Sequence, residues 1–208
     1  MIYVVDDDAA VLSSLQALFS AHNYQVQCYP SAEQFLREIS INRRGCVVTD
    51  VAMPGMSGVE LVRRLYEGKS PLSIVVVTGV ATVPMAVGLM EYGAFTLLEK
   101  PYDSQKLLQA VDRGLKISDE QCEQSQREQD IQRRLSQLTE EERNVMDRLL
   151  ADKPNKSISS ELHLSLRTVD RRRQSVLEKL GVGSVPEMAL LLGPLRSVEV
   201  SRQRTPAQ

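Results

Sequence analysis

The sequence predicts an α/β domain built on a doubly wound, five-stranded parallel sheet, then a helical linker and a small all-helical domain. Three observations predict this architecture. Over residues 1–117, five short apolar runs alternate with amphipathic helical patterns, as in a parallel sheet with helices on both faces. Glutamine and charged residues dominate residues 118–136. From residue 137 onward the apolar periodicity is helical throughout.

The strands are predicted from short apolar runs, most of them rich in valine, isoleucine or aromatic residues. These runs are Ile2–Val5, Tyr24–Cys28, Cys46–Thr49, Ile74–Val77 and Phe95–Leu98. A helical pattern follows each of them, and four of these patterns have a capping residue at the start or a glycine at the end. The expected helices cover 11–19, 31–39, 59–68, 83–92 and 103 to about 116. Residues 1–117 therefore have the content and size of one domain.

Residues 118–136 are predicted to form a linker helix. Ile117, Gln124, Ile131 and Leu138 are seven residues apart, which is the spacing of a thin coiled-coil seam. Two interpretations follow from this pattern and stay open. The segment is either a solvated linker or an extension of the preceding helix that pairs weakly with a second chain.

The helical domain is predicted to span residues 137–193. Thr139–Glu142 and Ser184–Glu187 have the spacing of capping boxes that begin its first and last helices. A longer helix is expected within 165–181, between a serine cap and a glycine stop. The segment 194–208 has a low density of apolar residues, so we expect a flexible tail.

Composition excludes several classes of protein. The 208 residues carry 25 basic and 27 acidic side chains, a net charge of −2, but residues 137–208 alone carry +2. No apolar run approaches the roughly 20 residues of a membrane helix, and no signal peptide pattern begins the chain. Three cysteines without metal-site spacing argue against a disulfide scaffold. We therefore expect a cytoplasmic protein whose C-terminal third contacts a polyanion.

Polar side chains follow four of the predicted strands. Asp6, Asp7 and Asp8 follow the first strand, Asp50 the third, Thr78 the fourth and Lys100 the fifth. Because parallel strands end at one edge of the sheet, these groups should meet there. Clustered carboxylates favour Mg²⁺, and a carboxylate is also able to act as a nucleophile toward a phosphoryl group. Gly55 and Gly58 would let the chain bend tightly beside Asp50.

The predicted helix within 165–181 carries a net charge of +3. Its apolar residues leave four side chains near the outward face: Arg167, Arg171, Gln174 and Ser175. Arg172 and Arg173 turn toward the flanks of the helix. A basic helix of this size fits the major groove of DNA, where arginines contact guanine edges or phosphates.

Two sets of motifs resemble known domains. The stretches Val4–Asp8, Val48–Gly58, Val77–Gly79 and Glu99–Pro101 resemble the receiver domain of two-component response regulators. The stretches Leu138–Arg143, Asn155–Lys156, Leu166–Val169 and Lys179–Leu180 resemble the LuxR-type helix-turn-helix. Together they are similar to the NarL/FixJ group, and Val83–Val87 favours the FixJ side of it.

The resemblance implies that a sensor histidine kinase phosphorylates Asp50, and that the protein is a transcriptional regulator rather than a turnover enzyme. It implies Mg²⁺ on Asp7, Asp50 and the Ala52 backbone carbonyl, with Asp6 bound through water, and phosphate contacts from Thr78 and Lys100. The residues expected to contact double-stranded DNA are Arg167, Thr168, Arg171, Arg172, Gln174, Ser175 and Lys179. A homodimer formed on phosphorylation and contact with RNA polymerase are further expectations.

The sequence departs from the family pattern at two places. Leu97 stands where the family usually has an aromatic switch residue. Phe95, two residues earlier, is predicted to point to the same side of that strand as Leu97, because side chains along a strand alternate with a period of two. Ser157–Ser159, preceded by Pro154, replaces the usual Glu-Ile-Ala after Asn-Lys.

Two alternative functions remain open. Leu97 gives weight to a regulator or adaptor that works without phosphorylation. Asp6 and Asp8 also resemble the start of a haloacid-dehalogenase-type phosphatase, which needs a second acidic motif that only Asp103 and Asp112 offer.

Overall fold

We describe the chain from a computed structural model, which covers residues 1–40 and 42–202. The chain divides into two compact units, Met1–Glu123 and Gln124–Gln208, which are described separately. Within the described residues, no helix is long and apolar enough to cross a membrane.

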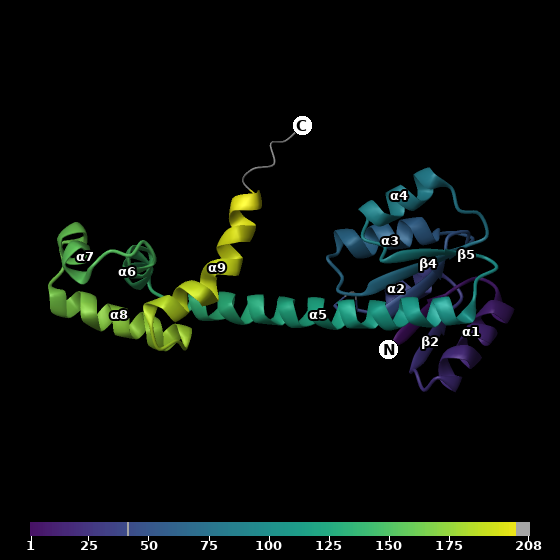
Figure 1. Cartoon of the computed structure of the whole chain (residues 1–208), viewed down its shortest axis with the longest axis horizontal. Coiled ribbons are helices and arrows are strands. Elements are labelled where there is room, and N and C mark those ends of the chain that lie inside the picture. Colours follow the sequence, from purple (N-terminus) through teal and green to yellow (C-terminus); the bar gives the residue numbers. More distant parts are fainter. Residues whose placement is uncertain (41, 203–208) are drawn as a thin grey trace. The chain divides into compact units, whose positions relative to one another are not determined.

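The first unit is built on the predicted five-stranded parallel sheet, in the order β2-β1-β3-β4-β5 (Figure 1). Its strands are β1 (Ile2–Val5), β2 (Val26–Tyr29), β3 (Cys46–Asp50), β4 (Ser73–Thr78) and β5 (Thr96–Glu99). The order reverses direction after β1, which places β1 beside β3 at the centre of the sheet. The carboxyl ends of β1 and β3 are therefore adjacent, as the sequence predicted.

Helices cover both faces of the sheet. They are α1 (Ala9–Ala21), α2 (Ala32–Glu38), α3 (Gly58–Glu67), α4 (Val83–Glu91) and α5 (Ser104–Ser136). One buried cluster joins Phe35 of α2, Leu61 of α3 and Leu89 of α4 to one face of the sheet. The other joins Phe19 of α1 and Leu107 of α5 to the opposite face. Successive strand residues alternate between the two clusters, which explains why the strands are apolar throughout.

Helix α5 includes the predicted linker, in agreement with the interpretation that residues 118–136 extend the preceding helix; the pairing with a second chain stays a prediction. The expected end near Lys116 is wrong, because α5 continues without a break to Ser136. Ser118 and Cys122 are buried, and the Ser118 hydroxyl accepts a hydrogen bond of 2.9 Å from the Gly45 backbone N–H. Val111, Gly114, Ser118 and Cys122 follow a spacing of three or four residues, so one face of α5 continues the packing of the first unit.

The second unit contains α6 (Glu140–Leu150), α7 (Asn155–Leu162), α8 (Leu166–Leu180) and α9 (Val185–Arg202). Val145, Ile158, Val169, Val176 and Leu180 are completely buried in its core. Pro154 occupies the cap position before α7, and its carbonyl accepts a hydrogen bond from the Ile158 N–H at 3.1 Å. Pro154 and the unusual Ser157–Ser159 sequence are therefore compatible with a helix at this position.

The last turns of α5 belong to this second unit. Ile131 and Leu135 pack against its core, although the sequence placed both in the linker. Arg134 donates a hydrogen bond of 2.8 Å to the Leu180 carbonyl at the end of α8. A domain that began at residue 137 would lose these contacts.

The last helix continues past the predicted end of the helical domain. Helix α9 passes residue 193 and extends to Arg202, so the expected tail 194–208 begins inside a helix. Residues 203–208 lie outside the described part of the chain.

Candidate functional site

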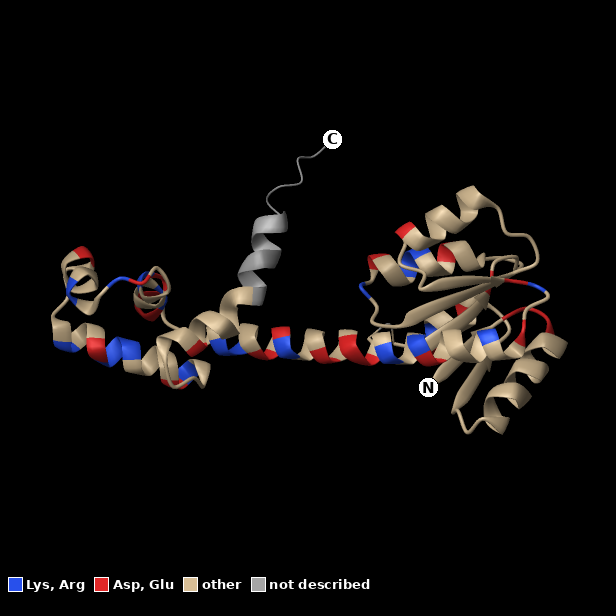
Figure 2. Ribbon diagram, viewed as in Figure 1, with Lys and Arg blue, Asp and Glu red and all other residues tan. Residues whose placement is uncertain are grey.

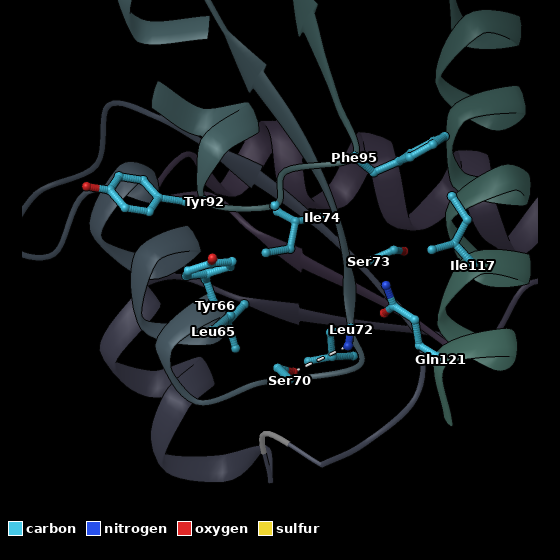
Figure 3. Close-up of a pocket in the computed structure, with 11 residues that line it drawn as sticks. Leu65, Tyr66, Ser70, Leu72, Ser73, Ile74, Tyr92, Phe95, Ile117 and Gln121 are labelled. Carbon is cyan, nitrogen blue, oxygen red and sulfur yellow. Dashed lines mark hydrogen bonds between the residues drawn. The ribbon is translucent and has the colours of Figure 1, made fainter. Parts of the chain in front are cut away.

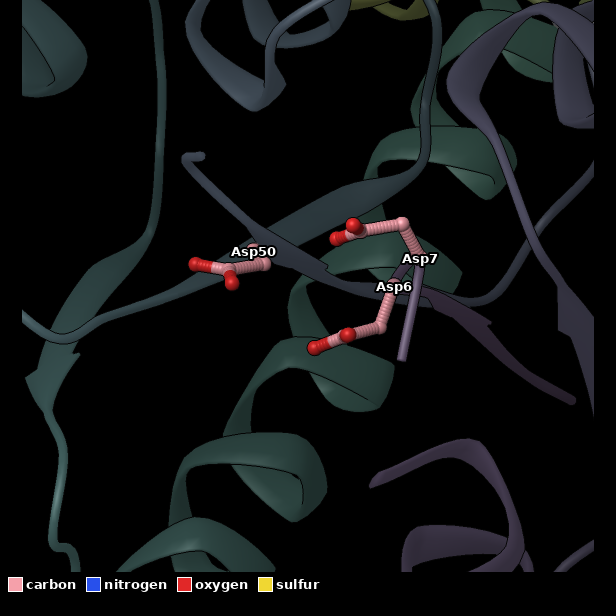
Figure 4. Close-up of side chains that lie close together, drawn as sticks. All are labelled: Asp6, Asp7 and Asp50. Carbon is pink, nitrogen blue, oxygen red and sulfur yellow. The ribbon is translucent and has the colours of Figure 1, made fainter. Parts of the chain in front are cut away.

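Three carboxylates meet at the carboxyl edge of the sheet. Asp6 and Asp7 directly follow β1, and Asp50 is the last residue of β3. One oxygen of each lies within 4.8 Å of the others (Figure 4). The predicted cluster is thus present, and its hard oxygen donors fit a small divalent cation such as Mg²⁺.

Lys100 reaches this cluster from the residue after β5. Its Nζ lies 3.1 Å from Oδ2 of Asp50 and 3.4 Å from Oδ2 of Asp6. Burial works to lower the pKa of Lys100, but the hydrogen bond to Asp50 and the charges of both aspartates outweigh it and raise this pKa. Lys100 is therefore a fixed cation beside two anions.

The two carboxylates bound to Lys100 differ in accessibility. The Asp6 side chain is 5% exposed, and its Oδ1 accepts a hydrogen bond from the Asp8 N–H at 2.9 Å. Burial is the main reason that the pKa of Asp6 is raised. The Asp50 side chain is 14% exposed, and its Oδ1 accepts from the Val51 N–H at 2.7 Å. Asp50 combines contact with Lys100 and access from solvent.

Thr78 ends β4 next to this group and is buried. Its hydroxyl donates to the Val80 carbonyl at 3.1 Å and accepts from the Val80 N–H at 3.2 Å. Its hydroxyl would have to turn away from Val80 to contact a phosphoryl oxygen.

The loop between β3 and α3 contains Ala52 and Gly55, and Gly58 is the first residue of α3. Gly55 has a φ of +75°, a conformation that glycine adopts without strain. A Cβ on Gly58 would lie 1.9 Å from the Asp50 carbonyl oxygen, so only glycine fits at this position. Glu33 of α2, which was not predicted from the sequence, also contacts this loop, because its Oε1 accepts a hydrogen bond of 2.7 Å from the Met56 N–H.

Helix α8 contains several basic residues, blue in the ribbon of Figure 2. Arg167, Arg171 and Gln174 are exposed, whereas Thr168 is half-buried and its hydroxyl lies 2.8 Å from that of Ser165. Arg172 forms an ion pair of 2.6 Å with Glu141 of α6. The helix therefore presents Arg167 and Arg171, one turn apart, to solvent.

Ser175 and Lys179, two of the residues expected to contact DNA, both bind a carboxylate of α6. The predicted outward position of Ser175 is wrong, because its hydroxyl donates to Glu142 of α6 at 2.7 Å. Lys179 binds the same carboxylate, with its Nζ at 2.8 and 2.6 Å from the two oxygens. Burial opposes ionisation, but hydrogen bonds from Lys179, Ser175 and the Thr139 backbone lower the pKa of Glu142 to about 2. Ser175 and Lys179 therefore connect α8 to α6 through Glu142.

Comparisons with known proteins identify the families of both domains. Residues 2–112 match the family "Response regulator receiver domain", and residues 136–192 match "Bacterial regulatory proteins, luxR family". Transcriptional regulatory protein FixJ of Azorhizobium caulinodans is 39% identical, over 92% of each chain. Response regulator protein TodT of Pseudomonas putida is 32% identical, over 90% of this chain and 83% of its own. The solved structure of response regulator StyR superposes with a TM-score of 0.85 at 32% identity, covering 93% of this chain and 98% of StyR.

The chain is a response regulator of the FixJ type. It joins a receiver domain to a LuxR-type DNA-binding domain, and it is a phosphorylation-controlled regulator of transcription.

The switch region of this response regulator differs from the sequence prediction. Leu97 packs with the cluster that includes Leu89 of α4, whereas Phe95 packs with the opposite cluster. The expectation that both lie on one side is wrong, because Phe95 precedes β5 and the period of the strand does not reach it. Phe95 lines a cavity of about 260 Å³, across from Ile117 of α5 (Figure 3). Position 97 therefore has no aromatic side chain, and the aromatic ring of Phe95 lies on the opposite face of the sheet.

Proposed function

We propose that Asp50 accepts a phosphoryl group from a sensor histidine kinase. The observation that carries this proposal is the contact of Lys100 with Asp50, the more exposed of its two carboxylate partners. An oxygen of Asp50 would form the new bond to phosphorus as the bond to the kinase histidine breaks. Lys100 would stabilise the charge on the phosphoryl oxygens, and Thr78 would donate a hydrogen bond to one of them.

We propose Mg²⁺ as the cation of this site. Asp7, Asp50 and the Ala52 carbonyl would bind it directly and Asp6 through a water molecule, in agreement with the proximity of the three carboxylates. When bound, the metal would neutralise charge on the phosphoryl oxygens.

The DNA-binding surface that we propose lies on α8. Arg167 and Arg171 are exposed on one side of the helix and are suited to reading bases in the major groove of double-stranded DNA. Thr168, Arg172 and Gln174 would contact the phosphate backbone beside them. Because Ser175 and Lys179 hold Glu142, we assign them the support of α8 rather than base contacts.

Phosphorylation would favour a homodimer that presents two such helices to two half-sites. Helix α4 supports this proposal, because Val83, Val87 and Met90 are 78%, 51% and 43% exposed and offer an apolar face to a second copy. Dimers on DNA would then contact RNA polymerase in the cytoplasm. The protein would act as a switch and not as an enzyme with turnover.

The phosphatase alternative loses support in the structure. Asp103 and Asp112 were the candidates for its second acidic motif. Asp103 instead accepts a hydrogen bond from the Gln105 N–H at the start of α5, and Asp112 accepts one from the Tyr24 hydroxyl. The other alternative, regulation without phosphorylation, still has one observation in its favour, which is Leu97 in place of an aromatic residue.

Asp50→Asn tests the proposed acceptor. We expect the unsubstituted protein, incubated with acetyl phosphate and Mg²⁺, to gain the mass of one phosphoryl group in a form labile to hydroxylamine. Asp50→Asn should gain none, because an amide oxygen is not a nucleophile of comparable strength. Intact-protein mass spectrometry measures both.

Asp8→Asn provides the matched control for this experiment. Asp8 is a neighbouring carboxylate that caps α1 through the Ala10 N–H, and asparagine is an equally good cap. This variant should label normally. Equal labelling of Asp50→Asn would show that another carboxylate is the acceptor.

A further inference from the structure

We propose that Glu33 is a positioning residue for the metal-binding loop of the receiver domain. This inference rests on the proposed phosphorylation site, because the loop between β3 and α3 carries the Ala52 carbonyl assigned to Mg²⁺. Glu33 lies on a different element, in the first turn of α2. It would hold the loop in the shape that turns this carbonyl toward the metal.

The contact between Glu33 and the loop is specific. Oε1 of Glu33 accepts a hydrogen bond of 2.7 Å from the Met56 N–H, four residues after Ala52. A hydrogen bond to an ionised carboxylate is stronger than one between neutral groups. The ends of the loop are fixed by two backbone hydrogen bonds, from Val51 to Val77 at 3.2 Å and from Gly58 to Val51 at 3.0 Å. Glu33 thus holds the loop between two points that the fold already fixes.

Gly55 gives an independent sign that the loop is built around this carboxylate. A Cβ on Gly55 would lie 2.6 Å from Oε1 of Glu33, which is closer than a Cβ atom approaches other heavy atoms in proteins. The glycine therefore lets the carboxylate approach the backbone of the loop. Gly55 also has a φ of +75°, so the loop adopts a shape that other residues rarely take.

The electrostatics of Glu33 fit the same role. Hydrogen bonds from its own backbone N–H and from the Met56 N–H lower the pKa of Glu33. The carboxylate is therefore charged throughout the neutral range. It lies outside the cluster of Asp6, Asp7 and Asp50, so it acts on the metal through the loop and not as a ligand.

The test compares Glu33→Ala with Glu33→Gln in the full-length protein. Hydrogen exchange measures protection of the Met56 amide, and calorimetric titration with Mg²⁺ alone measures the dissociation constant. Loss of one charged hydrogen bond should speed exchange in Glu33→Ala about tenfold and weaken Mg²⁺ binding about three- to tenfold. Glu33→Gln keeps an acceptor oxygen and should lie closer to the unsubstituted protein in both measurements.

Glu38→Ala is the matched control, because Glu38 lies on the same helix and accepts a hydrogen bond from Gln34 rather than from the loop. It should change neither measurement. The inference is overturned if Glu33→Ala leaves Mg²⁺ affinity unchanged, with or without faster exchange. It is equally overturned if Glu33→Gln is as impaired as Glu33→Ala, since the charge at the start of α2 would then explain the effect.

The outcome separates this inference from the proposed function. If the unsubstituted protein bound no Mg²⁺ and took no phosphate from acetyl phosphate, the proposed site itself would fail. If the unsubstituted protein behaved as proposed and Glu33→Ala behaved identically, only the role of Glu33 would fail.

Discussion

Gly58→Ala is expected to destabilise the receiver domain by about 3 kcal/mol, because overpacking against rigid neighbours carries a cost of this order. The added Cβ would lie 1.9 Å from the carbonyl oxygen of Asp50, 2.8 Å from its carbonyl carbon and 3.1 Å from the Val51 Cα. All three are backbone atoms, so either the end of β3 or the start of α3 must move. Asp50 would move with β3, and phosphate labelling should fall together with stability. Urea unfolding of the full-length protein measures the change.

Gly88→Ala is the matched control for this substitution. Gly88 lies inside α4, and a Cβ there meets no atom within 4 Å. Alanine favours helix over glycine, so this variant should be as stable as the unsubstituted protein, or up to about 1 kcal/mol more stable. Equal stability of both alanine variants would contradict the close packing of α3 on β3.

Glu142 should control the stability of the DNA-binding domain at acid pH. Its pKa is lowered from an ordinary value of 4.5 to about 2, so the stabilisation is complete above pH 4.5 and is lost as the pH falls toward 2. A shift of this size corresponds to a loss of about 3 kcal/mol across that window. Urea unfolding of the fragment 124–208, which retains Ile131, Arg134 and Leu135, measures this profile. Glu142→Gln should lower stability at pH 7 and flatten the profile between pH 4.5 and 2.

The neighbouring Glu141 offers the control for this prediction. Its side chain is 68% exposed and pairs with Arg172, and exposed ion pairs contribute about 1 kcal/mol or less. Glu141→Gln should therefore keep most of the stability and the full acid dependence. A Glu142→Gln variant that kept the acid dependence would show that another group is responsible.

The sheet and its acidic cluster could be predicted because both depend on local patterns. The short apolar runs predicted the positions of β1 to β5 to within a few residues. Asp6, Asp7 and Asp50 lie close together because parallel strands end at one edge of the sheet. Several helix starts could likewise be predicted, since Ser31, Thr139 and Ser165 each accept a hydrogen bond from a backbone N–H in the first turn.

The features that were missed depend on contacts between distant parts of the chain. The end of α5 was placed near Lys116 because glutamine and charged residues dominate the segment after it, yet the Ser118 hydroxyl satisfies a buried N–H of Gly45. Ser175 could be assigned to a helical face, but the sequence did not indicate that Glu142 of α6 lies opposite it. Glu33 had no distinctive local pattern beyond an acidic residue at a helix start. Its partner, the Met56 N–H, lies in a loop whose path the sequence left open.

The central claim is that phosphorylation of Asp50 controls binding to DNA, and one titration tests it most directly. Fluorescence anisotropy would measure the affinity of the full-length protein for sites selected from a random DNA pool, with and without acetyl phosphate and Mg²⁺. Arg171→Ala, which removes an exposed cation of α8, serves as the control that binding is through this helix. It should lose about 1–3 kcal/mol of affinity under both conditions.

Acetyl phosphate should raise the affinity of the unsubstituted protein about tenfold, a coupling of ordinary size between two sites. The affinity of Asp50→Asn should not change, although its DNA-binding domain is intact. If acetyl phosphate labelled Asp50 and left the affinity for DNA unchanged, control by phosphorylation would be contradicted. The regulator suggested by Leu97, which works without phosphorylation, would then be the better account.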